Sequence, residues 1–249
     1  MQKLRSQAAP TAVGCTPQGP SGSREPHRVG SWLRDIILGG QDGLVNVLGI
    51  VLGATAAGAD TRILVAAALA ATFAESLSMG AVAYTSRLAE RDHYLSELQR
   101  ELREIRECPE EERQEVRDIY RAKGFDGPLL EAIVDRMTAD EETWLHVMMA
   151  EELQLEPVDT RDVLRTAMTV TLASIVGSLV PLLPFFVLPS PSAVWLAVAI
   201  SAATLFGVGA YKATSLVGDW RRSGAQMVLI GLGAALAGFL VGRVFGVSD

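Results

Sequence analysis

The sequence predicts an all-α integral membrane protein with five transmembrane helices and a cytosolic helical metal-binding segment between the second and the third. Three observations predict this fold class. The mean hydropathy is +0.25, which is high for a soluble domain. Five apolar stretches are each long enough to cross a bilayer core. The charge is also uneven: residues 87–165 hold 22 acidic and 12 basic residues, a net charge of −10, whereas the rest of the chain carries +3.

The first element is a polar tail. Residues 1–29 are rich in Ser, Pro, Gly and Gln and contain no apolar run, so we expect a disordered cytosolic tail and no secretory signal peptide. The two cysteines, Cys15 and Cys108, lie far apart without a CxxC spacing. Their spacing argues against a disulfide framework and against a zinc site.

The apolar stretches divide into two groups. Residues 30–87 are expected to form the first two transmembrane helices, in which Asp42 and Glu75 are the single charges of their spans. Residues 163–249 are expected to form the other three, whose apolar cores carry no charge. Basic residues gather before the first span and between the last two. With five spans these regions share one side with the acidic segment, and the positive-inside rule makes that side cytosolic. The predicted spans are Ile36–Ala57, Ile63–Ser86, Thr166–Leu188, Ala193–Tyr211 and Ala225–Val241.

Residues 88–162 are predicted to form the acidic cytosolic domain from helices. Leucine and isoleucine recur at three- and four-residue steps from Leu88 to Ile105, so the second span should continue out of the membrane as a helix. Pro109 should end that helix and, with three glutamates after it, begin the next. Two more helices are expected at about 128–137 and 139–155, the second capped by Thr138.

Asp42 and Glu75 are the candidate residues within the membrane. A carboxylate in hydrocarbon costs about 2.5–3.5 kcal/mol on insertion scales unless it faces a polar cavity or partner. The pair therefore indicates a cation path or a proton site. Met79 follows Glu75 by one helical turn, and a thioether beside a carboxylate suits transition metals. The alternatives are that one carboxylate lies near the interface and reaches water, and that Met79 only packs.

The acidic segment offers a second candidate site. Glutamates are paired at three-residue spacing on both sides of Pro109, and a methionine-rich, acidic run with His146 lies near the end of the segment. Carboxylates with a thioether could bind Fe²⁺, Mn²⁺ or Zn²⁺. Spacing alone favours the alternative, a solvated acidic face with ion pairs such as Glu97 with Arg100 and Glu104 with Arg103. The candidates are Glu101, Glu104, Glu112, Glu115, Met148, Glu151 and Glu152.

Four motifs resemble the vacuolar iron transporter family, and the likeness covers about residues 32–246. Two of them lie in the first two spans: Arg34-Asp35 followed by LGGQDGLV from Leu38, and AESLSMG from Ala74. The third, WLHVMMAEEL at Trp144–Leu153, is similar to the end of that family's metal-binding domain. The fourth opens the fifth span at Arg222 and runs to Gly231.

The resemblance implies a homodimer that moves Fe²⁺, and also Mn²⁺, out of the cytosol by proton antiport. It places the membrane path at Asp42 and Met79, and the cytosolic metal site at Glu101, Glu104, Glu112, Glu115, Met148 and Glu152, with Glu151 competing for the role of Glu152. The chain departs from the family pattern at Ala83, where many members carry a glutamate. Glu75 is the candidate replacement for that glutamate.

The expected function is therefore transport of Fe²⁺, with Mn²⁺, Zn²⁺ and Co²⁺ as further candidate ions, and neither an enzyme nor a nucleic-acid-binding protein is expected. The membrane would be the inner membrane of a bacterium, or a vacuolar or other organelle membrane of a eukaryote. The alternative is a membrane-anchored protein that sequesters or stores metal without transport. Its ferritin-like form is disfavoured because the Glu-x-x-His pairs of di-iron sites are absent. A purely structural scaffold does not explain two intramembrane carboxylates.

Overall fold

The computed structural model describes residues 28–215 and 218–246, and side chains from Trp32 onward. Over these residues every regular element is a helix, and five helices are long and apolar enough to cross a membrane. This confirms the predicted fold class. The prediction of a disordered tail falls on residues outside those described. The membrane helices are α1 (Arg28–Ala56), α2 (Thr61–Glu107), α6 (Thr160–Leu182), α7 (Ser190–Ser215) and α8 (Trp220–Phe245).

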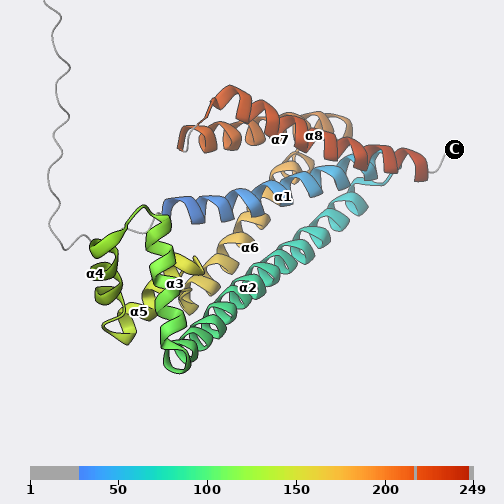
Figure 1. The fold of residues 1–249 in the computed structure, drawn as a ribbon. Coiled ribbons are helices and arrows are strands. Elements are labelled where there is room, and N and C mark those ends of the chain that lie inside the picture. The colour runs from blue at the N-terminus through green and yellow to red at the C-terminus, as the bar shows by residue number, and fades with distance from the viewer. Residues whose placement is uncertain (1–27, 216–217, 247–249) are drawn as a thin grey trace, which may run out of the picture.

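Helix α1 is the centre of the membrane part. It lies between α8 on one side and α6 with α2 on the other, while α7 packs chiefly on α8 (Figure 1). Small residues permit the close approach: a Cβ on Gly177 of α6 would lie 2.1 Å from the Gly40 carbonyl oxygen of α1. A Cβ on Gly242 of α8 would lie 2.0 Å from the carbonyl oxygen of Gly53. Because lipid provides no hydrophobic force between helices, such tight backbone packing holds them together.

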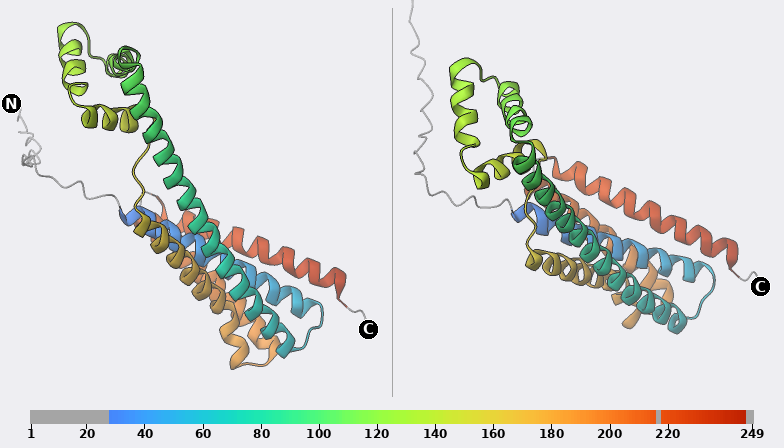
Figure 2. Two further views of the ribbon diagram at one scale, coloured as in Figure 1. Left: turned by 90° about the horizontal axis from the view of Figure 1, so that it is seen from below. Right: turned by 60° about the horizontal axis from the view of Figure 1, so that its bottom comes forward.

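Helix α2 joins the membrane part to the soluble part. It is a single helix of 47 residues, and Figure 2 shows it extending beyond the other membrane helices to carry the soluble helices at its end. Its N-terminus is capped by Asp60, whose carboxylate accepts a hydrogen bond from the Arg62 backbone at 2.8 Å. The predicted continuation of the second span out of the membrane is therefore observed.

The soluble part consists of α3 (Pro109–Ala122), α4 (Gly127–Met137), α5 (Glu141–Val147) and a π-helical turn, η1 (Met148–Glu152). Helix α3 begins at Pro109 as predicted. The predicted cap is wrong: Thr138 ends α4, and Asp140 caps α5 by accepting from the Thr143 backbone at 3.0 Å. These helices enclose a small apolar core of their own. Its buried residues are Ile105, Val116, Leu130, Val134, Trp144, Val147 and Met148.

The predicted single helix over 139–155 is interrupted at its end. Helix α5 stops at Val147, and in η1 the Leu153 backbone N–H donates to the Met148 carbonyl oxygen at 3.1 Å, a five-residue step. Gln154 follows with a φ of 53°, a left-handed conformation that is uncommon outside glycine. The wide turn and this residue end the domain and direct the chain back towards the start of α6.

Candidate metal sites

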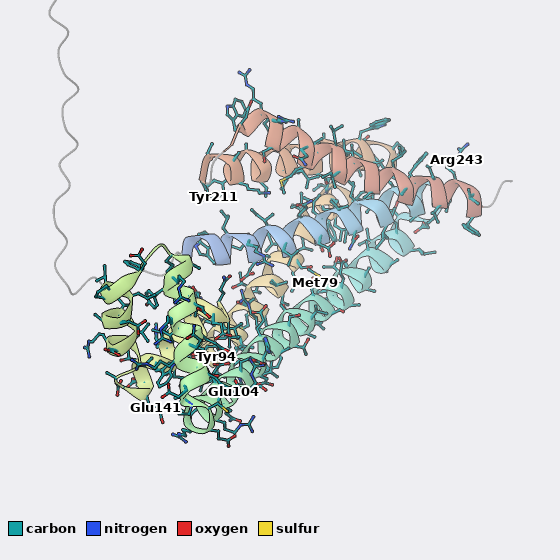
Figure 3. All side chains as sticks on the ribbon, in the orientation of Figure 1. Met79, Tyr94, Glu104, Glu141, Tyr211 and Arg243 are labelled. Atoms are coloured by element: carbon teal, nitrogen blue, oxygen red, sulfur yellow. The ribbon has the colours of Figure 1, made fainter. Side chains whose placement is uncertain are left out.

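The membrane candidates lie together on α1 and α2. Asp42 is within hydrogen-bonding range of Glu75, and both are half-buried. The side-chain amide of Asn46, one turn after Asp42, donates to the Glu75 carboxylate. Met79 is half-buried one turn beyond Glu75, and Figure 3 shows it in the membrane part of α2. The structure therefore brings two carboxylates, an amide and a neighbouring thioether to one region between two helices.

Sequence reasoning missed Asn46. Its spacing of four from Asp42 was the available signal, because residues four apart share one face of a helix. The side chain of Asn46 is exposed, although α1 is long and apolar enough to cross a membrane. A polar face at this depth requires a protein partner or a water-filled space, since lipid satisfies neither amide nor carboxylate.

The carboxylates of the soluble part meet where the end of α2, the start of α3 and η1 come together. Glu101 and Glu112 are only 2% and 5% exposed, and one carboxylate oxygen of Glu112 is buried without a hydrogen-bond partner. Burial raises the pKa of Glu112 to about 7, with further contributions from Glu115, Glu101, Glu104 and Glu152. Five predicted glutamates therefore interact electrostatically in one place: Glu101, Glu104, Glu112, Glu115 and Glu152. We call them the cytosolic cluster, after the side of the membrane that the sequence predicts for them.

Glu152 and Glu151 have different surroundings. Although Glu152 is exposed at the chain surface, partial desolvation raises its pKa to about 7, together with the charges of Glu115 and Glu101. Glu151 forms an ion pair with Lys123 at the end of α3. The geometry thus places Glu152 in the cytosolic cluster and Glu151 outside it.

The remaining predicted ligand, Met148, is completely buried in the apolar core of the soluble part. It precedes Glu152 by four residues on η1. Over the described residues, no three His, Cys, Asp or Glu side chains are already arranged to hold one ion. Binding an ion at the cytosolic cluster therefore requires side-chain rotation, and the positive charge of the ion would then offset the repulsion among the carboxylates.

Ion pairs also occur on this surface, as the alternative reading predicted. Arg100 pairs with Glu97 at 2.8 Å and with Glu101 at 3.2 Å. The expected pair of Glu104 with Arg103 is wrong, because Glu104 lies 3.4 Å from Arg100 instead. One arginine therefore faces three glutamates, and it leaves the negative charge at Glu112 and Glu152 unpaired in part.

A cavity of about 690 Å³ lies between the two candidate sites. On α2 it is lined by residues from Arg87 to Tyr94, which fall between Met79 in the membrane and Glu101 in the soluble part. Asp35, which is 8% exposed, and Arg165 close it from α1 and α6. The chain thus contains a cavity with charged and apolar residues in its lining at the boundary between its two parts.

A polytopic helical membrane protein with acidic residues inside its spans, and a second acidic cluster outside them, has the general construction of a membrane transporter for cations. The comparison with protein families identifies the group. Residues 33–243 match the model of the VIT family, and the chain belongs to that family, whose members are transporters and not enzymes.

Three relatives illustrate the match. The chain is 33% identical over 216 residues to vacuolar iron transporter 1 of Arabidopsis thaliana, covering 86% of each chain. It is 35% identical over 211 residues to vacuolar iron transporter 2 of Oryza sativa subsp. japonica, covering 84% of this chain and 86% of the relative. It is 33% identical over 222 residues to the vacuolar iron transporter of Plasmodium falciparum, covering 85% and 81%.

Proposed function

We propose that this chain transports Fe²⁺ out of the cytosol across the membrane by exchange for protons, and that Mn²⁺ is a second substrate. The observation that carries the proposal is the position of Asp42 beside Glu75 within two membrane helices. The relatives described above are named as iron transporters, which supports the choice of ion. The acidic soluble part and the basic ends of the spans lie on one side of the membrane in this topology, and the basic residues favour the cytosol for that side.

In this scheme the cytosolic cluster captures hydrated Fe²⁺ and raises its concentration near the membrane. Carboxylate oxygens suit Fe²⁺ and Mn²⁺ alike, and the thioether of Met79 favours transition metals over Ca²⁺ and Mg²⁺. The ion then moves to Asp42, Glu75 and Met79, and Asn46 holds Glu75 in position by its hydrogen bond. Protons arriving from the opposite side neutralise the two carboxylates and release the metal.

The functional unit is proposed to be a homodimer. The polar face formed by Asp42 and the exposed Asn46 would otherwise meet lipid, and a second copy of the chain would cover it. Both protomers would then contribute carboxylates to a path along the shared axis. Cross-linking in native membranes through a cysteine placed at Asn46 would trap a dimer; a purely monomeric product would contradict this assembly.

The test is Fe²⁺ flux into liposomes that contain the purified chain and an internal pH indicator. Wild-type protein should take up Fe²⁺ while protons leave. Asp42→Ala should abolish both signals and leave folding intact, whereas Asp118→Asn, on the exposed surface of α3, should change neither. Normal flux in Asp42→Ala would refute the proposed path. Tight Fe²⁺ binding without uptake by the wild-type chain would favour metal sequestration.

A further inference from the structure

The connection between α7 and α8 carries exposed aromatic and basic side chains. Tyr211 and Lys212 lie in the last turns of α7, and Trp220, Arg221 and Arg222 form the first turn of α8. All five side chains are exposed, Tyr211 by 55% and Trp220 by 45%. We call these five residues the α7–α8 basic surface. Figure 3 shows Tyr211 at the end of the helix pair opposite to Arg243, so this surface marks one boundary of the membrane part.

The aromatic ring of this surface is held in a fixed position. Trp220 packs edge-on against Phe206 of α7, with ring centroids 6.0 Å apart. The guanidinium of Arg221 lies over the Trp220 ring, 5.1 Å from its centroid. A tryptophan fixed at the end of a membrane helix, with a cation over its face, has the position that aromatic residues adopt at the headgroup level of a bilayer.

The basic residues have no acidic partner in the described structure. Among the residues described, no carboxylate lies within 4.0 Å of the charged groups of Lys212, Arg221 or Arg222. The nearby Asp219 is engaged as the cap of α8, where it accepts a hydrogen bond from the Arg221 backbone at 2.8 Å. The surface therefore presents positive charge that the described part of the protein does not neutralise, whereas Arg106 and Arg117 of the soluble part form ion pairs.

We propose that the α7–α8 basic surface binds the headgroup of an anionic phospholipid. Lys212, Arg221 and Arg222 contact the phosphate and its neighbouring headgroup oxygens, while Tyr211 and Trp220 lie against the glycerol region. The assignment of the lipid to the cytosolic leaflet rests on the orientation given in the proposed function. The binding itself depends only on the basic surface and its place at the end of two apolar helices. The positive charge of the surface complements the negative headgroup, and this complementarity selects anionic phospholipids.

The test uses the full chain, purified in detergent and stripped of lipid, and counts bound lipids by native mass spectrometry. Phosphatidylglycerol and phosphatidylcholine with identical acyl chains are titrated separately. Because each cation near an anionic surface contributes about a 5-fold gain in affinity, the wild type should prefer phosphatidylglycerol on the order of 10- to 100-fold. Lys212→Gln/Arg221→Gln/Arg222→Gln should lose that preference and retain binding to phosphatidylcholine.

Two controls separate this site from general electrostatics and from misfolding. Arg62→Gln/Arg243→Gln removes one cation at the start of α2 and one near the end of α8, away from the α7–α8 basic surface. This variant should keep the wild-type preference. If the triple variant fails to fold, Arg222→Gln alone should reduce the preference about 5-fold. A triple variant with unchanged preference, a wild type without one, or displacement of the lipid by inorganic phosphate at equal concentration would each overturn the proposal. No transport is measured, so failure of iron transport leaves this result intact.

Discussion

The pKa of Glu112 leads to a sharp prediction for the metal-free chain. The pKa rises from 4.5 to about 7 on folding because the carboxyl group is buried and surrounded by other carboxylates. The folded state therefore binds this proton more tightly than the unfolded state, so its contribution to stability is present below pH 4.5 and is lost as the pH rises through 7. At 1.36 kcal/mol per pKa unit, the full loss is on the order of 3 kcal/mol, or about 300-fold in the local opening equilibrium, of which most falls between pH 5 and pH 8.

The assay is hydrogen–deuterium exchange of α3 amides in the detergent-solubilised full chain, expressed as protection factors to remove the intrinsic pH dependence of exchange. Protection should fall on the order of 100-fold between pH 5 and pH 8. Glu112→Gln should flatten this dependence, and Glu112→Gln/Glu152→Gln should remove it. Glu131→Gln is the matched control, since Glu131 is exposed and paired with Arg117, which lowers its pKa. Protection that is independent of pH in the wild type would refute the reasoning.

Three further predictions concern individual residues. Glu152→Gln should weaken Mn²⁺ binding by the solubilised chain at least 10-fold in calorimetry, because the charge of Glu152 belongs to the cytosolic cluster. Glu151→Gln, outside the cluster, should change the Mn²⁺ affinity less than 3-fold, and the reverse order would contradict this placement. Gly177→Ala should lower the thermal unfolding temperature and the yield, because the added Cβ meets the α1 backbone, while Gly207→Ala, with open space around it, should leave both unchanged. With the other cysteine replaced by serine, the exposed Cys108 should react slowly with iodoacetamide at pH 7 and faster above pH 9. The reason is that partial desolvation of the thiol and the charges of neighbouring glutamates raise its pKa; fast labelling at pH 7 would contradict this.

The membrane helices could be predicted from the sequence because their signal is local. Each span is a continuous apolar run whose length matches a bilayer, and Pro109 marks a helix start by its own covalent geometry. Several observed helices extend beyond the predicted spans, as at Arg28 and Glu107, since apolar composition detects the hydrocarbon part and not the helix that continues into water. The predicted third span is wrong at its end: α6 stops at Leu182 and a 3₁₀ turn follows to Phe186, so the helix does not reach Leu188.

Features set by contacts between distant residues could not be predicted in the same way. The spacing of Glu101 and Glu112 permitted a shared site, but only the fold of α2 against α3 brings them together and buries both. The choice between Thr138 and Asp140 as a cap depends on where the chain turns, which neither residue determines alone. The contact of Asn46 with Glu75 likewise requires the packing of α1 against α2.

Because α2 is long and continuous, a small tilt at one end displaces the other end by a large distance. Glu75 and Glu101 are 26 residues apart on one uninterrupted helix, a distance of about 39 Å at 1.5 Å per residue. A tilt of about 10° at the membrane end would displace the soluble end by about 7 Å, which exceeds the rise of one full helical turn. Under the proposed function, a small rearrangement around an ion at Asp42 and Glu75 would therefore produce a large movement of the helices that carry the cytosolic cluster.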